Sequence, residues 1–429
     1  MMVEAPLSLS NVQIVAGYLV FTASYVVFAF GKFPGMKIDR PGMAIIGAVL
    51  MVVFRIVNPA AALRHIDFPT IVLLFAMMVL VGNLRLAGFF ERVGEFALQR
   101  LGKRHVLPAV IFTSGVLSAF FVNDIVCLVM VPFVLSITRR FRLPPLRYLL
   151  AVATASNIGS VATITGNPQN ILIGSYSGVS YRGFLAHLGP VALGGLLLNW
   201  LVLHYSRGLD RAAPAATGST GELAPLTAGG LLTETTEEVR YPGTLPKAFL
   251  VTAAVLAGFL TGAPPALVAV VGAAVLLITR KVEPKRVYEE VDWGLLVFFL
   301  GLFVIVAGAE QVGITAALLE LARGANLHNS VIFTTITAAL SNLVSNVPAV
   351  MLLKSLVPQF PNPHQGWLVL AMASTLAGNL TITGSIANII VVERSRGEVR
   401  IGFWEYFRVG LPVTMATIVF GWSWLRLVG

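Results

Sequence analysis

The sequence contains few charged residues and a single cysteine. Asp, Glu, Lys and Arg make up 12% of the 429 residues, whereas apolar residues make up 56%. Soluble globular domains carry about 25% charged residues, so this composition excludes that class. Cys127 stands alone, which excludes an intrachain disulfide and a metal site built from several thiolates. We therefore expect an all-α polytopic membrane protein.

The sequence also lacks a set of residues for enzyme chemistry. No nucleophile and base form a recognisable pair, and the six histidines have no metal-ligand spacing. We expect no enzyme activity, no cofactor and no bound metal.

Basic residues outnumber acidic ones, and their positions indicate membrane orientation. The 30 Lys and Arg against 20 Asp and Glu give a net charge of +10. They lie mainly in short segments between apolar runs, which is typical of membrane topology and argues against a nucleic-acid partner. With the N-terminus outside, about 24 of the 30 fall on the cytoplasmic side. We expect an inner-membrane protein with both termini periplasmic; the basic residues left elsewhere are chiefly Arg55, Arg64, Arg182, Arg323, Lys354 and Arg426.

Residues 1–206 and 245–429 show the same order of segments. Between them, residues 207–244 are rich in Gly, Thr, Pro, Ala and Glu, which is typical of a solvated linker, here expected in the cytoplasm. In the first half we expect spans at about 10–30, 41–57, 67–87 and 184–206, an interfacial helix at 88–103, a re-entrant hairpin at about 105–138 and a broken helix at about 146–175. In the second half we expect spans at about 246–262, 265–279, 293–312 and 404–425, an interfacial stretch near 313–327, a hairpin at about 328–358 and a broken helix at about 367–392.

Matching residues support an internal duplication. Asp67 matches Asp292 at the start of a span, and Asn123 matches Asn346 at the hairpin tips. Each half then crosses the membrane an odd number of times, so the halves run in opposite directions. We predict two inverted repeats with about ten transmembrane helices, two re-entrant hairpins and two broken helices, the architecture of a secondary transporter.

Two polar stretches, Thr163–Asn170 and its partial copy Thr381–Asn388, interrupt apolar runs. Their residues unwind helices, and the freed backbone groups are tolerated in a membrane only where they line a polar cavity. With the hairpin tips they form a set without Lys, Arg or His, suited to a neutral polyol-like solute or to an anion held by helix N-termini. The alternative is that they only satisfy freed backbone groups. The set comprises Asn123, Ser345 and Asn346 at the tips, and Thr163, Thr165, Asn167, Asn170, Thr381, Thr383, Ser385 and Asn388 at the breaks.

Asp124 is the one acidic residue at a hairpin tip. An ionised carboxylate within an apolar run is costly unless it meets a cation, a proton or helix N-termini. We interpret Asp124 as a proton or cation carrier; the alternative, an N-cap for the second hairpin arm, is compatible with that role.

Other polar residues have simpler interpretations. Asp67 and Asp292 are expected to cap helices. Arg85 and Glu310, at equivalent positions of the two halves, are expected to snorkel or to form ion pairs. Cys127 is expected to pack in the core.

The Asn-based tips, the Thr-Gly-x-Pro-x-Asn break and the inverted duplication resemble the ion transporter superfamily over nearly the whole chain. That group includes divalent-anion and Na+ symporters, NhaD-type Na+/H+ antiporters and ArsB-type arsenite permeases. Dicarboxylate symporters of the group carry Ser-Asn-Thr at both tips, whereas here the tips are Val122-Asn123-Asp124 and Ser345-Asn346-Val347. The Asn-Asp tip and the approach Gly378–Thr381 are similar to the arsenite permease branch.

The resemblance implies export of arsenite and antimonite in exchange for protons. It also implies a homodimer in which a mobile part carries the site across the membrane in an elevator movement, sometimes with a cytoplasmic ATPase. Undissociated arsenite is a small neutral triol, which agrees with a set lacking fixed cations. The alternatives are Na+/H+ antiport, anion transport of the dicarboxylate or sulfate type, and, outside transport, a membrane receptor or scaffold.

Overall fold

The computed structural model describes residues 9–31, 37–99, 105–206, 208–209, 241–278, 281–324 and 329–428, and within these ranges it contains helices and no strand. The first half comprises α1 (Asn11–Phe30), α2 (Arg40–Val53), α3 (Pro59–His65), α4 (Phe68–Leu86), α5 (Phe89–Gln99), α6 (Val106–Phe120), α7 (Asn123–Phe141), α8 (Pro145–Ser160), α9 (Pro168–Ser177) and α10 (Tyr181–Tyr205). The second half comprises α11 (Leu245–Leu260), α12 (Pro265–Leu277), α13 (Pro284–Glu289), α14 (Trp293–Gln311), α15 (Ile314–Gly324), α16 (Ser330–Val344), α17 (Asn346–Leu353), α18 (Pro363–Ala377), α19 (Ile386–Ser395) and α20 (Phe403–Val428). The all-α, multi-helix membrane fold predicted from composition is confirmed.

The helices vary in length. Among the described residues, six helical segments are long and apolar enough to cross a bilayer: Asn11–Phe30, Phe68–Leu86, Tyr181–Tyr205, Pro242–Leu260, Trp293–Gln311 and Phe403–Val428. The predicted spans at 41–57 and 265–279 are the shorter apolar helices α2 and α12, of 14 and 13 residues. A short helix follows each of them, α3 after α2 and α13 after α12. The sequence analysis did not predict these two short helices. Most of the predicted linker at 207–244, residues 100–103 of the predicted interfacial helix and residues 325–327 of the second predicted interfacial stretch lie outside the described residues.

Local sequence explains where the predicted hairpins and breaks interrupt the chain. In the first break, α8 ends at Ser160, a short 3₁₀ turn covers Ile164–Gly166, and α9 begins at Pro168. Asn167 caps α9 because its side chain accepts from the backbone N–H of Asn170 at 2.8 Å. The second break repeats this with a 3₁₀ turn at Ile382–Gly384. Helix-breaking residues therefore end and restart each helix at the predicted positions.

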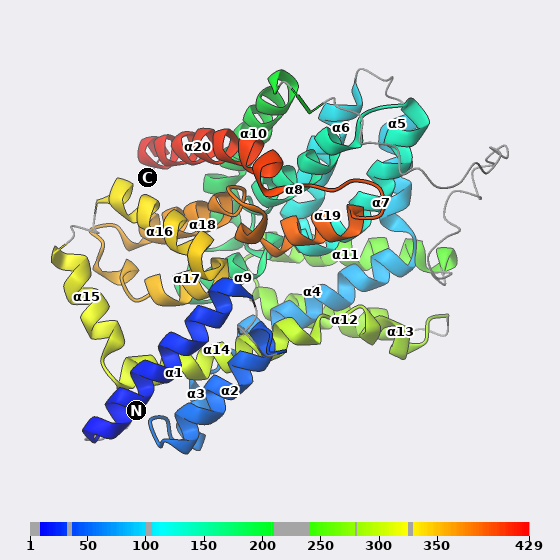
Figure 1. Ribbon diagram of the computed structural model, residues 1–429. Helices are drawn as coiled ribbons and strands as arrows, with labels where there is room; N and C mark the ends of the chain where they lie inside the picture. The colour runs from blue at the N-terminus through cyan, green and yellow to red at the C-terminus, as the bar shows by residue number, and fades with distance from the viewer. Residues whose placement is uncertain are drawn as a thin grey trace.

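The helices pack as two bundles, each of which takes helices from both halves of the sequence. We call α1–α4 with α11–α14 the frame bundle, and α6–α10 with α16–α20 the site bundle. In Figure 1 the frame bundle lies below and the site bundle above. They meet where α9 packs on α4, α17 on α14, and α16 on α1. Corresponding elements of the two halves thus lie in the same bundle.

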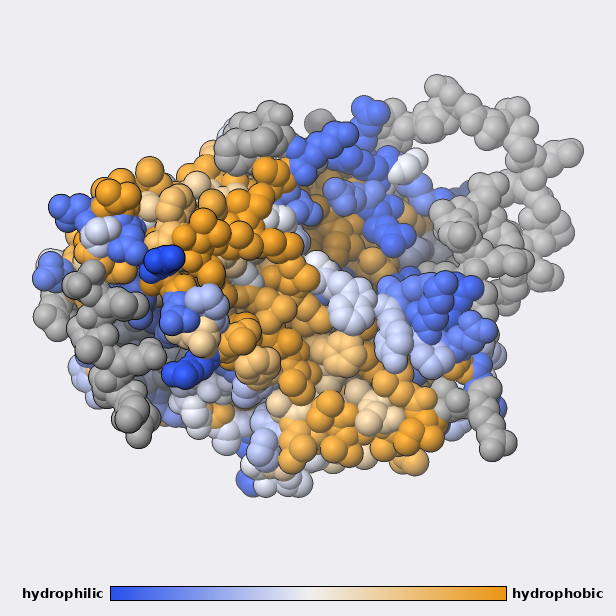
Figure 2. All heavy atoms as spheres, turned by 90° about the horizontal axis from the view of Figure 1, so that it is seen from below, coloured by the Kyte–Doolittle hydropathy of each residue, from blue (hydrophilic) through white to orange (hydrophobic). Residues whose placement is uncertain are grey.

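The surface agrees with a membrane environment. Figure 2 shows a largely apolar face of the molecule, with hydrophilic residues gathered toward its ends. Large apolar side chains such as Leu250 and Leu267 are 70% and 59% exposed, as expected for residues that face lipid. Both chain ends lie toward one side of the molecule, and α5 and α13 lie toward the other (Figure 1). This arrangement is compatible with the predicted topology, although the periplasmic placement of the termini stays a prediction.

Candidate functional site

Both hairpin tips and both breaks contribute to one cavity of about 300 Å³. We call it the first cavity. The site bundle contributes Asn123, Asp124, Pro168, Gln169, Ser345, Asn346, Val347, Ser385 and Ile386, and the frame bundle contributes Asp39, Arg40, Pro41, Asp292, Gly294, Leu295 and Phe298. The cavity therefore lies at the meeting of the two bundles and of the two halves.

Six helices begin at the wall of the first cavity. These are α7, α9, α17 and α19 of the site bundle, and α2 and α14 of the frame bundle. The first backbone N–H groups of a helix have no partner within the helix, and the helix dipole makes this end partly positive. The wall thus carries many hydrogen-bond donors, and it favours solutes that present oxygen atoms.

Four charged residues line the first cavity: Asp39, Arg40, Asp124 and Asp292. Asp39 and Asp292 cap α2 and α14, because their side chains accept backbone N–H groups at 2.9 Å. Arg40 is held by the Phe28 carbonyl, to which its Nε donates at 2.9 Å. Because three of these side chains are carboxylates and one is a guanidinium, acidic groups outnumber basic ones at the wall of the first cavity.

Asp124 differs from the two capping aspartates. It is half-buried in the second position of α7 and faces the first turn of α19, where the backbone N–H of Ala387 interacts with its carboxylate. Asp292 is close enough to repel it electrostatically. Asp124 therefore lies between a backbone donor of the second half and a carboxylate of the frame bundle.

Asn157 of α8 joins the two halves behind the cavity. Its Nδ2 donates to Asn379 Oδ1 at 3.0 Å and to Asn388 Oδ1 at 2.9 Å. Its Oδ1 accepts from Asn123 Nδ2 at 3.1 Å and from Ser385 Oγ at 2.9 Å. One buried amide of the first half thus orients the first tip and the second break together.

Thr375 of α18 makes the reciprocal connection. It stands at the position that corresponds to Asn157, and its Oγ1 accepts from Asn167 Nδ2 at 3.3 Å and from Gln169 Nε2 at 3.2 Å. It also donates to Asn170 Oδ1 at 3.4 Å. With the Asn346 amide turned so that its oxygen faces Gln169, Gln169 Nε2 also donates to Asn346 Oδ1 at 3.3 Å. The network is therefore crossed, since each half holds the break of the other.

The last asparagine of each break closes that break. Asn170 and Asn388 are fully buried, and each donates both amide hydrogens to carbonyls that the break has freed. The accepting carbonyls are those of Ser160 and Thr163 in the first break, both at 3.0 Å, and those of Gly378 and Thr381 in the second, at 2.7 and 2.9 Å. These bonds satisfy backbone groups that lipid could not.

One acceptor at the cavity wall has no protein partner. Asn123 is 4% exposed, and its Oδ1 is a buried oxygen for which the described residues provide no donor. At the second tip, Ser345 has φ 78° and ψ 158°, a backbone conformation that residues other than glycine rarely adopt. A buried unsatisfied oxygen calls for an explanation, and strained residues cluster at binding and active sites.

The predicted site residues fall into three groups in the structure. Asn123, Asp124, Ser345, Asn346 and Ser385 line the first cavity. Asn167, Asn170 and Asn388 lie directly behind it in the crossed network.

The third group consists of the four threonines of the breaks, which do not line the first cavity. Thr163 and Thr165 are fully buried, and the Thr165 hydroxyl lies 2.9 Å from that of Tyr181. Thr381 donates to Asn342 Oδ1 at 3.3 Å, and Thr383 is exposed. Thr163, Thr165 and Thr381 therefore tie the breaks to neighbouring helices, Thr383 is exposed, and none of the four side chains lines the first cavity.

Sequence interpretation missed several residues of the site. Asn157, Thr375 and Gln169 were not singled out, and Asp292 was interpreted as a cap alone. Arg40 is likewise absent from the residues that the sequence indicates for the site. The signal for Asn157 and Thr375 was available, because they correspond in the two halves and interrupt the apolar arms that precede the breaks.

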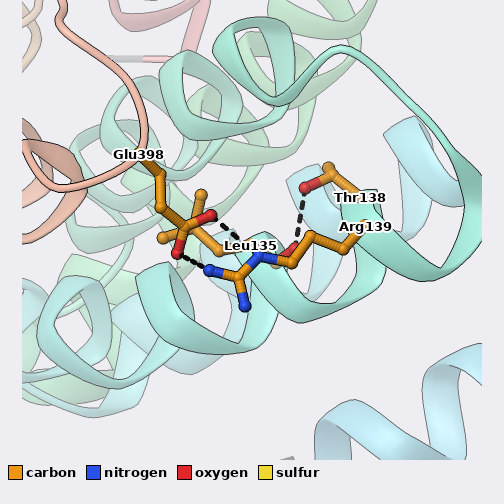
Figure 3. Close-up of polar contacts among 4 residues, drawn as sticks. All are labelled: Leu135, Thr138, Arg139 and Glu398. Carbon is orange, nitrogen blue, oxygen red and sulfur yellow. Dashed lines mark hydrogen bonds and ion pairs between the residues drawn. The ribbon is translucent and has the colours of Figure 1, made fainter. Parts of the chain in front are cut away.

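The remaining polar residues behave mostly as expected. Arg85 forms an ion pair with Glu290 at 2.9 Å, Asp67 caps α4, and Cys127 is fully buried. A second ion pair links the halves at the surface: Arg139 at the end of α7 binds Glu398, after α19, through both carboxylate oxygens (Figure 3). The Nε to Oε2 distance is 3.0 Å.

Comparison with known proteins identifies the family. The model of the citrate transporter family matches residues 25–377. The chain belongs to the citrate transporter family. A silicon efflux transporter, LSI3 of Oryza sativa subsp. japonica, is 31% identical, with 95% of this chain and 97% of the relative covered. A transporter named arsB from Dictyostelium discoideum is 26% identical, with 92% and 88% covered.

A solved structure supports the fold. The YdaH transporter of Alcanivorax borkumensis, described as having an unusual topology, aligns with a TM-score of 0.57 over 96% of both chains at 13% identity. This citrate transporter family member is thus a multi-pass membrane transporter, and its family consists of transporters and not of enzymes.

Proposed function

We propose that this protein is a secondary active transporter of the inner membrane that exports arsenite and antimonite, as neutral oxyacids, in exchange for protons. The observation that carries the proposal is the position of Asp124. It faces the N-terminus of α19 and lines the first cavity together with Asp292. An acidic residue in that place can bind a proton as the solute leaves and release it as the solute enters.

The chemistry of the wall supports a neutral hydroxylated solute. Such a solute has oxygen lone pairs, which accept from those N–H groups at the helix N-termini that the capping side chains leave free, and hydroxyl hydrogens, which need acceptors. The Asp124 carboxylate supplies an acceptor at the wall, and the buried Asn123 Oδ1 is a further acceptor without a protein partner. The name of the silicon efflux relative agrees with this class, because silicic acid is likewise a small uncharged oxyacid.

An anion of the citrate type is the second candidate. The helix N-termini and Arg40 favour it, whereas Asp39, Asp124 and Asp292 repel a polyanion. Na+/H+ antiport is the third candidate, since the same carboxylates attract a cation.

The proposal extends to movement and assembly. The division between frame and site bundles supports an elevator movement of the site bundle along the frame, within a homodimer. An associated cytoplasmic ATPase belongs to the same proposal.

Flux into everted membrane vesicles tests the function. We expect accumulation of arsenite that collapses when the proton gradient is removed and does not depend on Na+. Citrate uptake without arsenite uptake would move the assignment to the anion transporters. Proton movement triggered by Na+ alone would move it to the antiporters.

A further inference from the structure

A second cavity of about 300 Å³ lies at the other end of the helices that form the first. Three helices line both cavities: α9, α14 and α17. From Gln169 in the first cavity to Tyr176 in the second is seven residues of α9, roughly 10 Å of helix. Between the two cavities these helices carry buried apolar side chains such as Leu172 and Phe299. The two cavities are thus separated by a thin apolar layer along one seam between the bundles.

The second cavity contains a group of charged side chains. Lys354 follows α17 of the site bundle, whereas Glu310, Arg64 and His65 belong to α14 and α3 of the frame bundle. The Lys354 ammonium lies 4.0 Å from the centre of the Tyr176 ring. Glu310 and Asp67 both interact with it electrostatically. The cavity therefore combines strong donors with one carboxylate acceptor, Glu310.

These residues stand out against the charge pattern of the chain. Arg64 and Lys354 are two of the few basic residues that the predicted topology places outside the cytoplasm. Topology does not require them there. Lys354 and Glu310 come from different bundles and line the same cavity, yet within the described residues they form no ion pair with each other. The space between them can hold a solute that contacts both.

We propose that the second cavity is a further binding site for a small uncharged oxyacid, in which Lys354 donates to solute oxygens and Glu310 accepts a solute hydroxyl. This inference rests on the proposed function, because it assigns the same class of solute to a second site on the opposite side of the thin layer. The solute occupies this site after it leaves the first cavity and before it reaches bulk solvent.

Transport measured separately from each side tests the site. Arsenite is presented from the side of the membrane on which the N- and C-termini lie. From that side, Lys354→Met and Glu310→Gln should each raise the apparent KM about tenfold, equivalent to about 1.4 kcal/mol. The KM from the opposite side should stay unchanged. The control is Arg426→Gln, which removes a cation that contacts Trp422 and lines neither cavity. Equal changes on both sides, or no change, would overturn the proposal.

A labelling experiment separates this inference from the proposed function, because it needs no flux. The exposed His65 is replaced by cysteine in a Cys127→Ser background, and its reaction with a membrane-impermeant maleimide is timed. We expect silicic acid to slow labelling, and Lys354→Met to remove that protection. Protection without any flux would leave the site standing and reject the exporter; flux without protection would reject the site. Protection by inorganic phosphate alone would reject the uncharged class of solute.

Discussion

The two hairpin tips occupy corresponding positions and have different chemistry. The first tip carries Asn123 and Asp124 on an unstrained turn, whereas the second carries Asn346 and Val347 after the strained Ser345. The asparagines are shared, and the charge belongs to one half. We infer that both halves hold the solute and that the first half alone couples it to protons.

Asp124→Asn tests the difference between the two tips most directly. The change keeps the shape of the side chain and removes the exchangeable proton, so we expect gradient-driven arsenite flux to fall about 100-fold or more. Proton-independent exchange of arsenite should persist. The matched variant is Val347→Asn, which adds an amide at the second tip and should retain coupling. Full gradient-driven flux in Asp124→Asn would contradict the division of roles.

The halves also differ in how closely each hairpin approaches its broken helix. A Cβ on Gly159 of α8 would lie 2.0 Å from the carbonyl oxygen of Gly115 in α6. The corresponding positions of the second half are Ala377 and Ala338. Only the first half therefore needs backbone contact at this crossing.

Gly159→Ala should destabilise the protein by about 3 kcal/mol, because the helices must separate to admit the methyl group. Ala377→Gly should cost only about 1 kcal/mol, through backbone entropy and a lost methyl. Thermal unfolding in detergent micelles measures both. Similar losses in the two variants would mean that the closer approach in the first half has no energetic consequence.

The crossed network allows a third comparison. Asn157→Leu leaves four buried polar groups of both halves short of a partner, so we expect a loss of about 2 kcal/mol together with weaker arsenite binding. Thr375→Val keeps the side-chain shape and removes one hydroxyl, with an expected loss of about 1 kcal/mol. Unfolding and flux assays on the same preparations check the order. A larger effect from Thr375→Val would show that the second half dominates the network.

The smallest effect is expected at the surface. Arg139 and Glu398 are 64% and 32% exposed, and the corresponding positions, Asn362 and Ser180, carry no charge. Arg139→Ala should cost about 0.5 kcal/mol or less, and added salt should reduce the difference from the unsubstituted protein. Unfolding at low and high ionic strength measures this. A loss that ignores salt would indicate packing by the Arg139 side chain instead.

Much of the architecture could be predicted because its signals are local. The apolar runs, the tips around Asn123 and Asn346, and the breaks at Thr163–Asn170 and Thr381–Asn388 all appear in the structure near their predicted positions. The predicted ends of α2 and α12 were less accurate, because apolar composition continues past the helix and a turn such as that at Phe54 is set by packing.

The membrane class and the residues at which helices break could be inferred from the sequence, since each depends on the length of an apolar run or on the propensity of a short segment. Which polar residues share a cavity depends on the tertiary fold. Asn157 binds residues 222 and 231 positions away, and Thr165 turns from the cavity although it stands in the same motif as Asn167. Hydrogen bonds over such separations depend on how the bundles pack, and no local pattern encodes that packing.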